Sequence, residues 1–286
     1  MTPPGNQAVN REDKAQPVAL ERTECEETCI ERFAGVSRRY SRSRRQIMKP
    51  RILAILLCFV VITGCSAVKP IPVEKISAIN RIGVLSLLEN KIRMQYVGLT
   101  VFNNFTEEIP VNEWGIDKYV IETFRDKINK GSQMKFISFN YEYEPFMKAY
   151  RTGFSSKDVS KELAEIAQVN SLDALVFVKR SIFQDPVTHD KHVSGYGIFQ
   201  RSIAVVKRSA LYLVAQATMY EVKTMEIIGE FSIYNNKKID NDYFAKYFSG
   251  LPKEKKDYVE SWIKQSLRER IQLGLMRLNV INTNEG

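Results

Sequence analysis

The sequence contains few of the residues on which enzymes and metalloproteins usually depend. Of its 286 residues only two are histidine and four are cysteine, and no cysteine follows Cys65. A domain formed after Cys65 therefore has no cysteine for a disulfide or a thiolate metal site. The chain also lacks a glycine-rich phosphate loop, a His-Glu-x-x-His motif and a Gly-x-Ser-x-Gly nucleophile elbow. We therefore expect no cofactor and no catalysis.

The charge of the chain is modest and lies partly in its first residues. The formal net charge is +9, and residues 1–65 hold 11 basic and 7 acidic residues, so the remainder carries only +5. These later charges are scattered along the chain and do not form basic blocks. Nucleic-acid binding is therefore not expected.

One apolar run interrupts the polar amino-terminal part. Lys49 and Arg51 precede Ile52–Ile62, which contains only apolar residues. The run is shorter than the roughly 20 residues that a membrane-spanning helix needs. A cationic start, a short apolar stretch and small residues at its end are typical of an export signal, which we place at residues 48–64.

The end of this run is more specific. Ile62-Thr63-Gly64-Cys65 resembles the bacterial lipobox at all four positions. The resemblance implies cleavage before Cys65 and attachment of lipid to its thiol, while a plain signal peptide and an uncleaved anchor helix are the alternatives. Ser66 stands where inner-membrane retention signals carry Asp. The resemblance therefore implies an outer-membrane protein that faces the periplasm.

The preceding residues, 1–47, show no sustained apolar period, so we expect no packed structure there. The simplest interpretation is that translation starts at Met48. In the alternative, Ser43–Lys49 resembles the twin-arginine export signal. A strongly apolar run and the lack of a cofactor motif favour the general secretory route instead.

After Cys65 the pattern predicts a tether over residues 65–77 and one α/β domain over residues 78–286. Strands and helices alternate in its first half, as in crossover units built on a sheet. The expected segments are strands at Arg81–Leu88 and Ile92–Leu99, a polar loop at Asn103–Gly115, a helix at Ile116–Lys130, a strand at Met134–Phe139, a helix from Ser155 through Val169, and a strand at Leu172–Val178.

The second half of the domain changes character. Ser209–Glu221 alternates apolar and polar residues, and Met225–Tyr234 returns after a turn, which predicts a long antiparallel hairpin. Gly195-Tyr196-Gly197 is interpreted as a turn. An apolar stripe over Lys255–Leu278 predicts an amphipathic carboxy-terminal helix. The expected fold is thus α/β, with helices packed on a mixed sheet.

The order of these segments resembles a group of envelope lipoproteins. Four features carry the resemblance: the lipobox, the strand Arg81–Leu85, the long hairpin, and the segment Leu163–Ala167, which is followed by Asp173–Val176. The group includes the penicillin-binding-protein activator lipoproteins, the curli-secretion lipoprotein CsgG and the amino-terminal domain of TolB. It implies, for residues 78–234, an α/β sandwich related to anticodon-binding domains that binds partners and does not catalyse a reaction.

Two further groups of residues were considered as sites. His189 and His192, with Asp185 or Asp190, are residue types that bind a divalent metal. Lys191 would oppose a cation there, and polar residues are common in loops, so we predict no metal site. The alternative is a metal-assisted envelope hydrolase that uses His189, Asp190 and His192.

The second group is aromatic. Tyr141, Tyr143, Phe146 and Tyr150 alternate with acidic residues and form a candidate docking patch, because aromatic side chains often anchor interfaces. The alternative is that these rings cover an edge of the core.

Taken as a whole, the sequence predicts a non-catalytic binding or assembly module of the cell envelope. We expect the membrane to be its partner through lipid on Cys65, together with an envelope protein. Association into a homo-oligomer, as in secretion-type lipoproteins, is the remaining alternative.

Overall fold

The computed structural model describes residues 69–282, except 142–145, 147–155, 204–205 and 245–247. These residues belong to the second of two compact units into which the chain divides. Within this described part, no helix is both long and apolar enough to cross a membrane.

The predictions for the amino-terminal region fall largely outside these residues. This holds for the leader over residues 1–47 and for the signal peptide over residues 48–64 with its lipobox. The predicted tether over residues 65–77 is partly folded, because Ile71 is only 1% exposed and the short helix α2, Val73–Ser77, follows it. The packed body of the domain therefore begins at Ile71.

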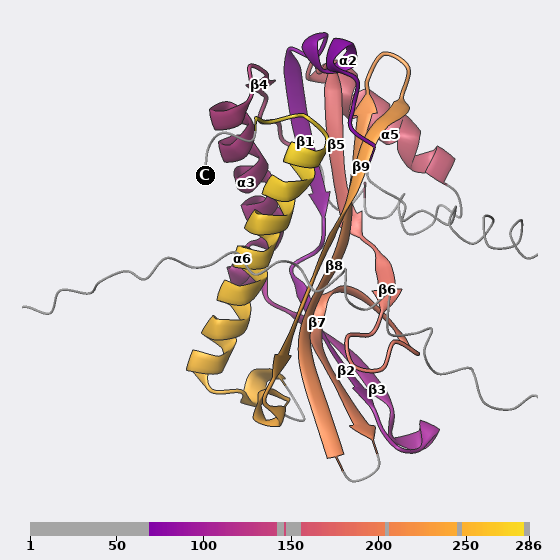
Figure 1. Cartoon of the computed structure of the whole chain (residues 1–286), viewed down its shortest axis with the longest axis vertical. Coiled ribbons are helices and arrows are strands. Elements are labelled where there is room, and N and C mark those ends of the chain that lie inside the picture. Colours follow the sequence, from indigo (N-terminus) through magenta and orange to yellow (C-terminus); the bar gives the residue numbers. More distant parts are fainter. Residues whose placement is uncertain (1–68, 142–145, 147–155, 204–205, 245–247, 283–286) are drawn as a thin grey trace, which may run out of the picture. The chain divides into compact units, whose positions relative to one another are not determined.

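The described chain forms one nine-stranded sheet and four α-helices (Figure 1). Its elements are α2, then β1 Arg81–Leu87, β2 Lys91–Val97, β3 Phe105–Pro110, α3 Ile116–Gly131, β4 Lys135–Phe136, α5 Ser156–Val169, β5 Ala174–Arg180, β6 Ile182–Gln184, β7 His192–Ile203, β8 Val206–Glu221, β9 Glu226–Ile239 and α6 Lys253–Arg277.

The sheet forks along β8. On one side β8 pairs with β9 over almost its whole length. On the other side residues 215–221 of β8 pair with β5, whereas residues 206–214 pair with β7. One arm of the fork then continues from β5 to β1 and β4, and the other continues from β7 to β2 and β3. The β8–β9 hairpin is thus the common spine of both arms.

Local sequence explains most of these elements. Ile116, Val120, Phe124 and Ile128 recur at steps of four along α3, and all four are buried. Alternate residues of β8 from Leu211 to Met219 are buried in the same core, as a strand period of two requires. The predicted mixed α/β fold, with its long hairpin and carboxy-terminal helix, is confirmed.

Two predictions were wrong. The segment Asn103–Gly115 is not a polar loop, because β3 lies within it and pairs antiparallel with β2. Its side chains are mostly exposed, so no apolar alternation marked the strand. Gly195-Tyr196-Gly197 is not a turn but part of the twelve-residue strand β7. A Cβ atom at Gly195 would crowd the Arg180 side chain, and one at Gly197 would clash with the backbone of Arg93, so the glycines allow close approach and do not reverse the chain.

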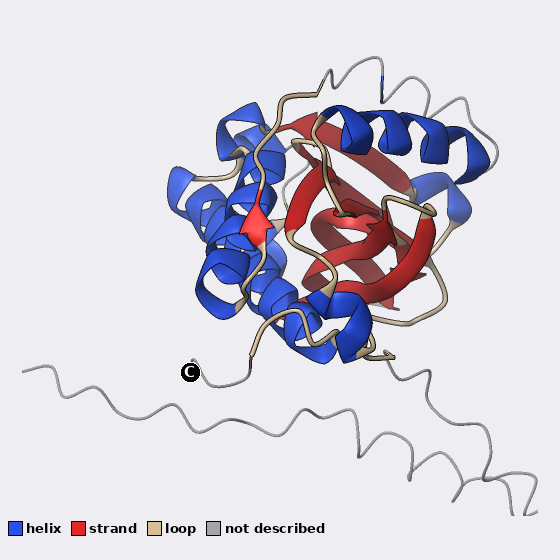
Figure 2. Ribbon diagram, turned by 90° about the horizontal axis from the view of Figure 1, so that it is seen from above, coloured by secondary structure: helices blue, strands red, loops and turns tan. Residues whose placement is uncertain are grey.

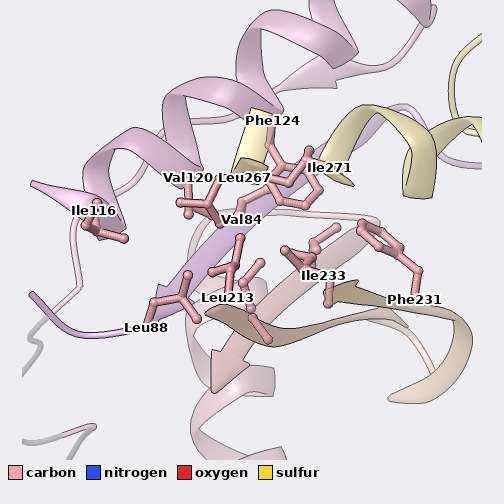
Figure 3. Close-up of a cluster of buried hydrophobic side chains, with 14 of the residues drawn as sticks. Val84, Leu88, Ile116, Val120, Phe124, Leu213, Phe231, Ile233, Leu267 and Ile271 are labelled. Atoms are coloured by element: carbon pink, nitrogen blue, oxygen red, sulfur yellow. The ribbon is translucent and has the colours of Figure 1, made fainter. Parts of the chain in front are cut away.

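Helices cover both faces of the sheet (Figure 2). α3 and α6 pack on one face around the largest core cluster, part of which is shown in Figure 3. There Phe124 of α3 and Ile271 of α6 lie above Leu213 and Ile233 of the hairpin. Leu163 of α5 belongs to a second cluster, which also contains residues of β1 and β5.

Candidate functional site

The point where the two arms separate is occupied by charged side chains. Arg180 ends β5, and its guanidinium lies 3.0 Å from the carboxylate of Glu89 and 3.0 Å from that of Glu108. Its Nε also donates a hydrogen bond of 2.8 Å to the Leu88 carbonyl. The side chains of Arg180 and Glu89 are only 17% and 9% exposed, so this arginine joins the two arms in a largely dry environment.

Glu108 is shared between two arginines. Arg93 of β2 lies 2.6 Å from the same Oε1 that Arg180 contacts. Burial by itself raises the pKa of Glu108, but hydrogen bonding from Arg93 and the charge of Arg180 outweigh it and lower the pKa. Glu108 is therefore ionised at neutral pH and bridges β2 and β5.

Asp117 is a buried acid next to this junction. Its Oδ1 accepts hydrogen bonds from the Ser86 hydroxyl at 2.7 Å and from the Leu88 N–H at 2.8 Å. Burial raises the pKa of Asp117 to about 6 despite these hydrogen bonds. Asp117 thus ties the start of α3 to the end of β1.

This acid gives a testable pH dependence. Since the pKa of Asp117 is 3.8 when unperturbed and about 6 when folded, the native state binds its proton more tightly. The free energy of unfolding should therefore fall by about 3 kcal/mol in total as pH rises from below 4 to above 6. Asp117→Asn should remove this slope, because the amide does not titrate. Its oxygen can still accept the hydrogen bonds from Ser86 and Leu88.

Urea denaturation between pH 4 and pH 7 measures the slope, and the exposed Asp126→Asn on the same helix is the control. An unchanged slope in Asp117→Asn would contradict the assignment.

The carboxyl ends of parallel strands are where open α/β sheets commonly bind ligands. Here that edge of β1 and β5 is filled by protein groups. The Tyr141 hydroxyl donates to the Ser86 carbonyl at 2.9 Å, and the Tyr196 hydroxyl donates to the Glu89 carbonyl at 2.8 Å. Burial raises the pKa of both hydroxyls, so both remain protonated. The Tyr196 hydrogen bond links β7 to the end of β1 and so joins the two arms, whereas the Tyr141 hydrogen bond lies within one arm.

The histidine-containing loop is organised by one aspartate. Asp185 is fully buried, and its carboxylate accepts hydrogen bonds from the backbone N–H groups of four residues: Val187, Thr188, Asp190 and Lys191. Burial alone raises the pKa of Asp185, but these hydrogen bonds outweigh it and lower the pKa. Asp185 therefore shapes the loop as an ionised acceptor.

The side chains of His189, Asp190 and His192 do not gather around a common point that could bind a metal. Asp190 forms an ion pair with Arg201 and accepts a hydrogen bond of 2.5 Å from Thr188. The Arg201 hydrogen bond lowers the pKa of Asp190 to about 2. His189 adopts a positive φ of 61° in the turn, and His192 begins β7. Within the described residues, no three His, Cys, Asp or Glu side chains are grouped to hold a metal ion.

The predicted aromatic patch is only partly described. Phe146 is 5% exposed and packs edge-on against Phe177 with ring centroids 6.0 Å apart. Tyr141 packs on the same cluster. Tyr143 and Tyr150 lie outside the described residues. For Tyr141 and Phe146 the alternative holds, since both rings cover an edge of the core and do not form an open surface.

Several exposed apolar side chains gather instead at one end of the arm that β7, β2 and β3 form. We name this group the apolar tip. Its members come from the β2–β3 connection, the start of β3 and the hairpin between β7 and β8, and they are Phe102 93%, Leu99 67%, Val206 54%, Ile203 39% and Phe105 37% exposed.

Strand pairing explains why these residues meet. β2 runs parallel to β7 with Val97 opposite Arg201, so the residues that follow on each strand emerge at the same end. Phe105 of the tip packs on Tyr96 and Phe244, and the centroids of the three rings lie 5.7–5.8 Å apart. The tip is therefore an apolar protrusion on an ordered aromatic base.

The surroundings of the tip favour an acidic partner surface. Residues 97–106 and 199–209 contain no Asp or Glu. Lys207 and Arg208 are exposed beside Val206. An exposed apolar group with a basic border is typical of an interaction site.

The fold defines a mixed α/β domain with a forked sheet, and sequence comparison adds no family to this description. No family of known proteins matches the chain, and no curated protein matches its sequence.

Comparison of structures gives distant similarities. The chain is similar to the PelC dodecamer from Paraburkholderia phytofirmans, with 6% identity over 74% of this chain and 94% of that chain and a TM-score of 0.32. It is also similar to lipoprotein GNA1162 from Neisseria meningitidis, with 12% identity, 65% and 96% coverage and a TM-score of 0.29. For the LpoB C-terminal domain from Salmonella enterica the identity is 12%, the coverage 66% and 94%, and the TM-score 0.21. Similarities of this degree carry no weight for function, which has to be inferred from the chain's own residues.

Proposed function

We propose that this chain is a lipid-anchored protein of the bacterial cell envelope that acts as a non-catalytic binding or assembly module. The proposed anchor is lipid on Cys65, supported by the match of Ile62-Thr63-Gly64-Cys65 to the lipobox. Ser66 favours the outer membrane, with the domain facing the periplasm. The binding role is carried by one observation, the apolar tip.

The position of the tip supports this role. Ile71 packs against Gly229 near the turn of the β8–β9 hairpin, and its N–H donates to the Leu278 carbonyl at 3.3 Å. Only five residues separate Cys65 from Ile71, and the six steps between their Cα atoms span at most about 20 Å. A lipid on Cys65 would therefore keep the α2 end of the domain beside the bilayer. The ends of β2 and β7, which carry the tip, lie at the other end of the spine (Figure 1).

The partner that this surface fits is a protein with an apolar pocket and an acidic border. A protruding phenylalanine such as Phe102 buries well in a pocket, and burial of an aromatic anchor typically dominates the energy of an interface. The acidic border would complement Lys207 and Arg208. Because the tip lies far from the proposed anchor, the bilayer that holds the protein is not its target.

Lipid attachment is tested by Cys65→Ser. We expect the variant to lose acyl labelling and to move from the membrane to the soluble fraction, because two or three acyl chains on one residue provide almost permanent attachment. Cys58→Ser, within the predicted signal, is the control and should remain in the membrane. Retention of Cys65→Ser in the membrane would support an uncleaved anchor helix instead.

Partner binding is tested by the double variant Leu99→Ser and Phe102→Ser. Both side chains are exposed, so folding should not change, while affinity for the partner should fall at least about 30-fold, or about 2 kcal/mol. The readout is a pull-down from envelope extract followed by titration of the captured protein. Val169→Ser is a matched control, since Val169 is 84% exposed on α5.

Equal capture by the double variant and the control would contradict the assignment of the tip. Binding of the tip to vesicles of anionic lipid, with no protein captured, would contradict the protein partner.

A further inference from the structure

The strand β9 is a long open edge of the sheet. Its fourteen residues pair with β8 on one side and, among the described residues, with no strand on the other. The remaining strands at the ends of the two arms, β3 and β4, have only six and two residues. A long edge strand presents a row of backbone groups to which another strand can add.

The two faces of β9 differ. Phe231 and Ile233 point into the core beneath α6 and are buried. The alternating residues Glu230, Ser232, Tyr234, Asn236 and Lys238 belong to the opposite face of the strand. The chain therefore places an acidic residue near one end of this row and a basic residue at the other, with a tyrosine at its centre.

This row is complementary to itself in the antiparallel direction. When a second copy is related by a two-fold axis through Tyr234, Glu230 lies opposite Lys238 of the other copy, and Ser232 lies opposite Asn236. Both pairs then occur twice. Opposite charges facing each other across antiparallel strands are stabilising, whereas a parallel arrangement in register would set like charges together.

Neither charged residue has a competing ionic partner in the described residues. Glu230 accepts a hydrogen bond of 3.1 Å from the neutral Gln216, and both Glu230 and Lys238 are exposed. Ile71, which contacts Gly229, lies just outside the pairing segment 230–238. On this side no described strand pairs with residues 230–238, and the Asn236 N–H, which donates to Asn235 Oδ1 at 3.0 Å, would exchange this local hydrogen bond for one to the second copy.

We infer that β9 is a self-association surface, through which two copies of this chain join their sheets by antiparallel pairing centred on Tyr234. The interface is isologous, as is usual for a dimer with two-fold symmetry. It does not depend on lipid at Cys65 or on the apolar tip, so a Cys65→Ser chain should dimerise equally well.

The register is tested by cysteine cross-linking in the full chain, extracted in mild detergent and oxidised. In Tyr234→Cys the two introduced residues face each other across the axis, with Cα atoms about 4.5–5.5 Å apart, within reach of a disulfide. We expect Tyr234→Cys to form more disulfide-linked dimer than the parent chain does under the same oxidation. In Ser232→Cys the two cysteines lie about 14 Å apart along the strands and should not cross-link.

The charge pairs are tested by exchange. Glu230→Lys and Lys238→Glu should each weaken dimerisation at least tenfold, because two attractive pairs become repulsive. The double variant should restore it, since the exchanged charges again lie opposite each other. Sedimentation equilibrium over a range of concentrations measures the dissociation constant without requiring a cross-link.

A parent chain that stays monomeric would overturn the inference. So would single charge variants that dimerise like the parent, or a Ser232→Cys chain that cross-links as efficiently as Tyr234→Cys.

Discussion

Replacing Arg180 with alanine should lower the free energy of unfolding by about 3–5 kcal/mol. The arginine neutralises Glu89, whose side chain is 9% exposed, and it also binds Glu108. Removal of one partner from a buried ion pair is strongly destabilising, because the charge of Glu89 then loses its 3.0 Å contact in a poorly solvated site, while Lys91 lies 3.9 Å away. Because Arg180 connects the two arms of the sheet, unfolding should also lose cooperativity. Thermal and urea denaturation followed by circular dichroism measure both effects.

The controls separate the loss of a charge pair from the loss of a side chain. Arg125→Ala removes an arginine that is 44% exposed and paired on the surface of α3, and it should change stability by less than about 1 kcal/mol. The double variant Arg180→Met and Glu89→Gln removes both charges, and it should be more stable than Arg180→Ala. If the double variant were the less stable of the two, the lost compensation of the Glu89 charge would not be the cause.

A second large effect is expected at Gly197. A Cβ atom on this residue would lie 1.8 Å from the carbonyl oxygen of Arg93 on the adjacent strand β2, far inside van der Waals contact. Gly197 lies opposite Arg93 in the β2–β7 pairing, so the backbone itself would have to move. Gly197→Ala should therefore destabilise the protein by at least about 3 kcal/mol, at the upper end of the cost of overpacking.

The matched control for this substitution is Gly250→Ala. A Cβ atom on Gly250 would meet no heavy atom within 4 Å, so stability should be nearly unchanged. Soluble yield and the midpoint of urea denaturation are the measurements. A Gly197→Ala chain as stable as the parent would show that β2 and β7 can separate at no cost.

The elements that the sequence predicted well are those with a strong apolar period. α3, α6 and the hairpin of β8 and β9 each place apolar residues on one face at the expected spacing, and the structure confirms them. Their boundaries shift by a few residues, and β9 extends to Ile239, beyond the predicted end at Tyr234. Residues 235–238 are polar or charged and carry no apolar signal, and pairing with β8 holds them in the strand.

The candidate site was not predictable in the same way. Leu99 and Phe102 stand in one part of the sequence and Ile203 and Val206 in another, and only the parallel pairing of β2 with β7 brings them together. In the predicted aromatic patch, by contrast, a residue expected at the surface is buried. Phe146 belongs to an aromatic-rich segment, but contact with Phe177 turns it inward. Exposure is a property of the packed chain, and the residue type alone does not determine it.

The sequence by itself determined the features that depend on neighbouring residues: the mixed α/β class, the main helices and the long hairpin. It also contains the lipobox-like motif Ile62-Thr63-Gly64-Cys65, on which the proposed anchor depends. Only the tertiary structure decided how the sheet forks, which charges meet at Arg180, which apolar residues form the tip and which strand is left as an open edge. The physical reason is that periodicity acts between residues a few positions apart, whereas sheet order and burial are set by contacts between residues far apart in the sequence.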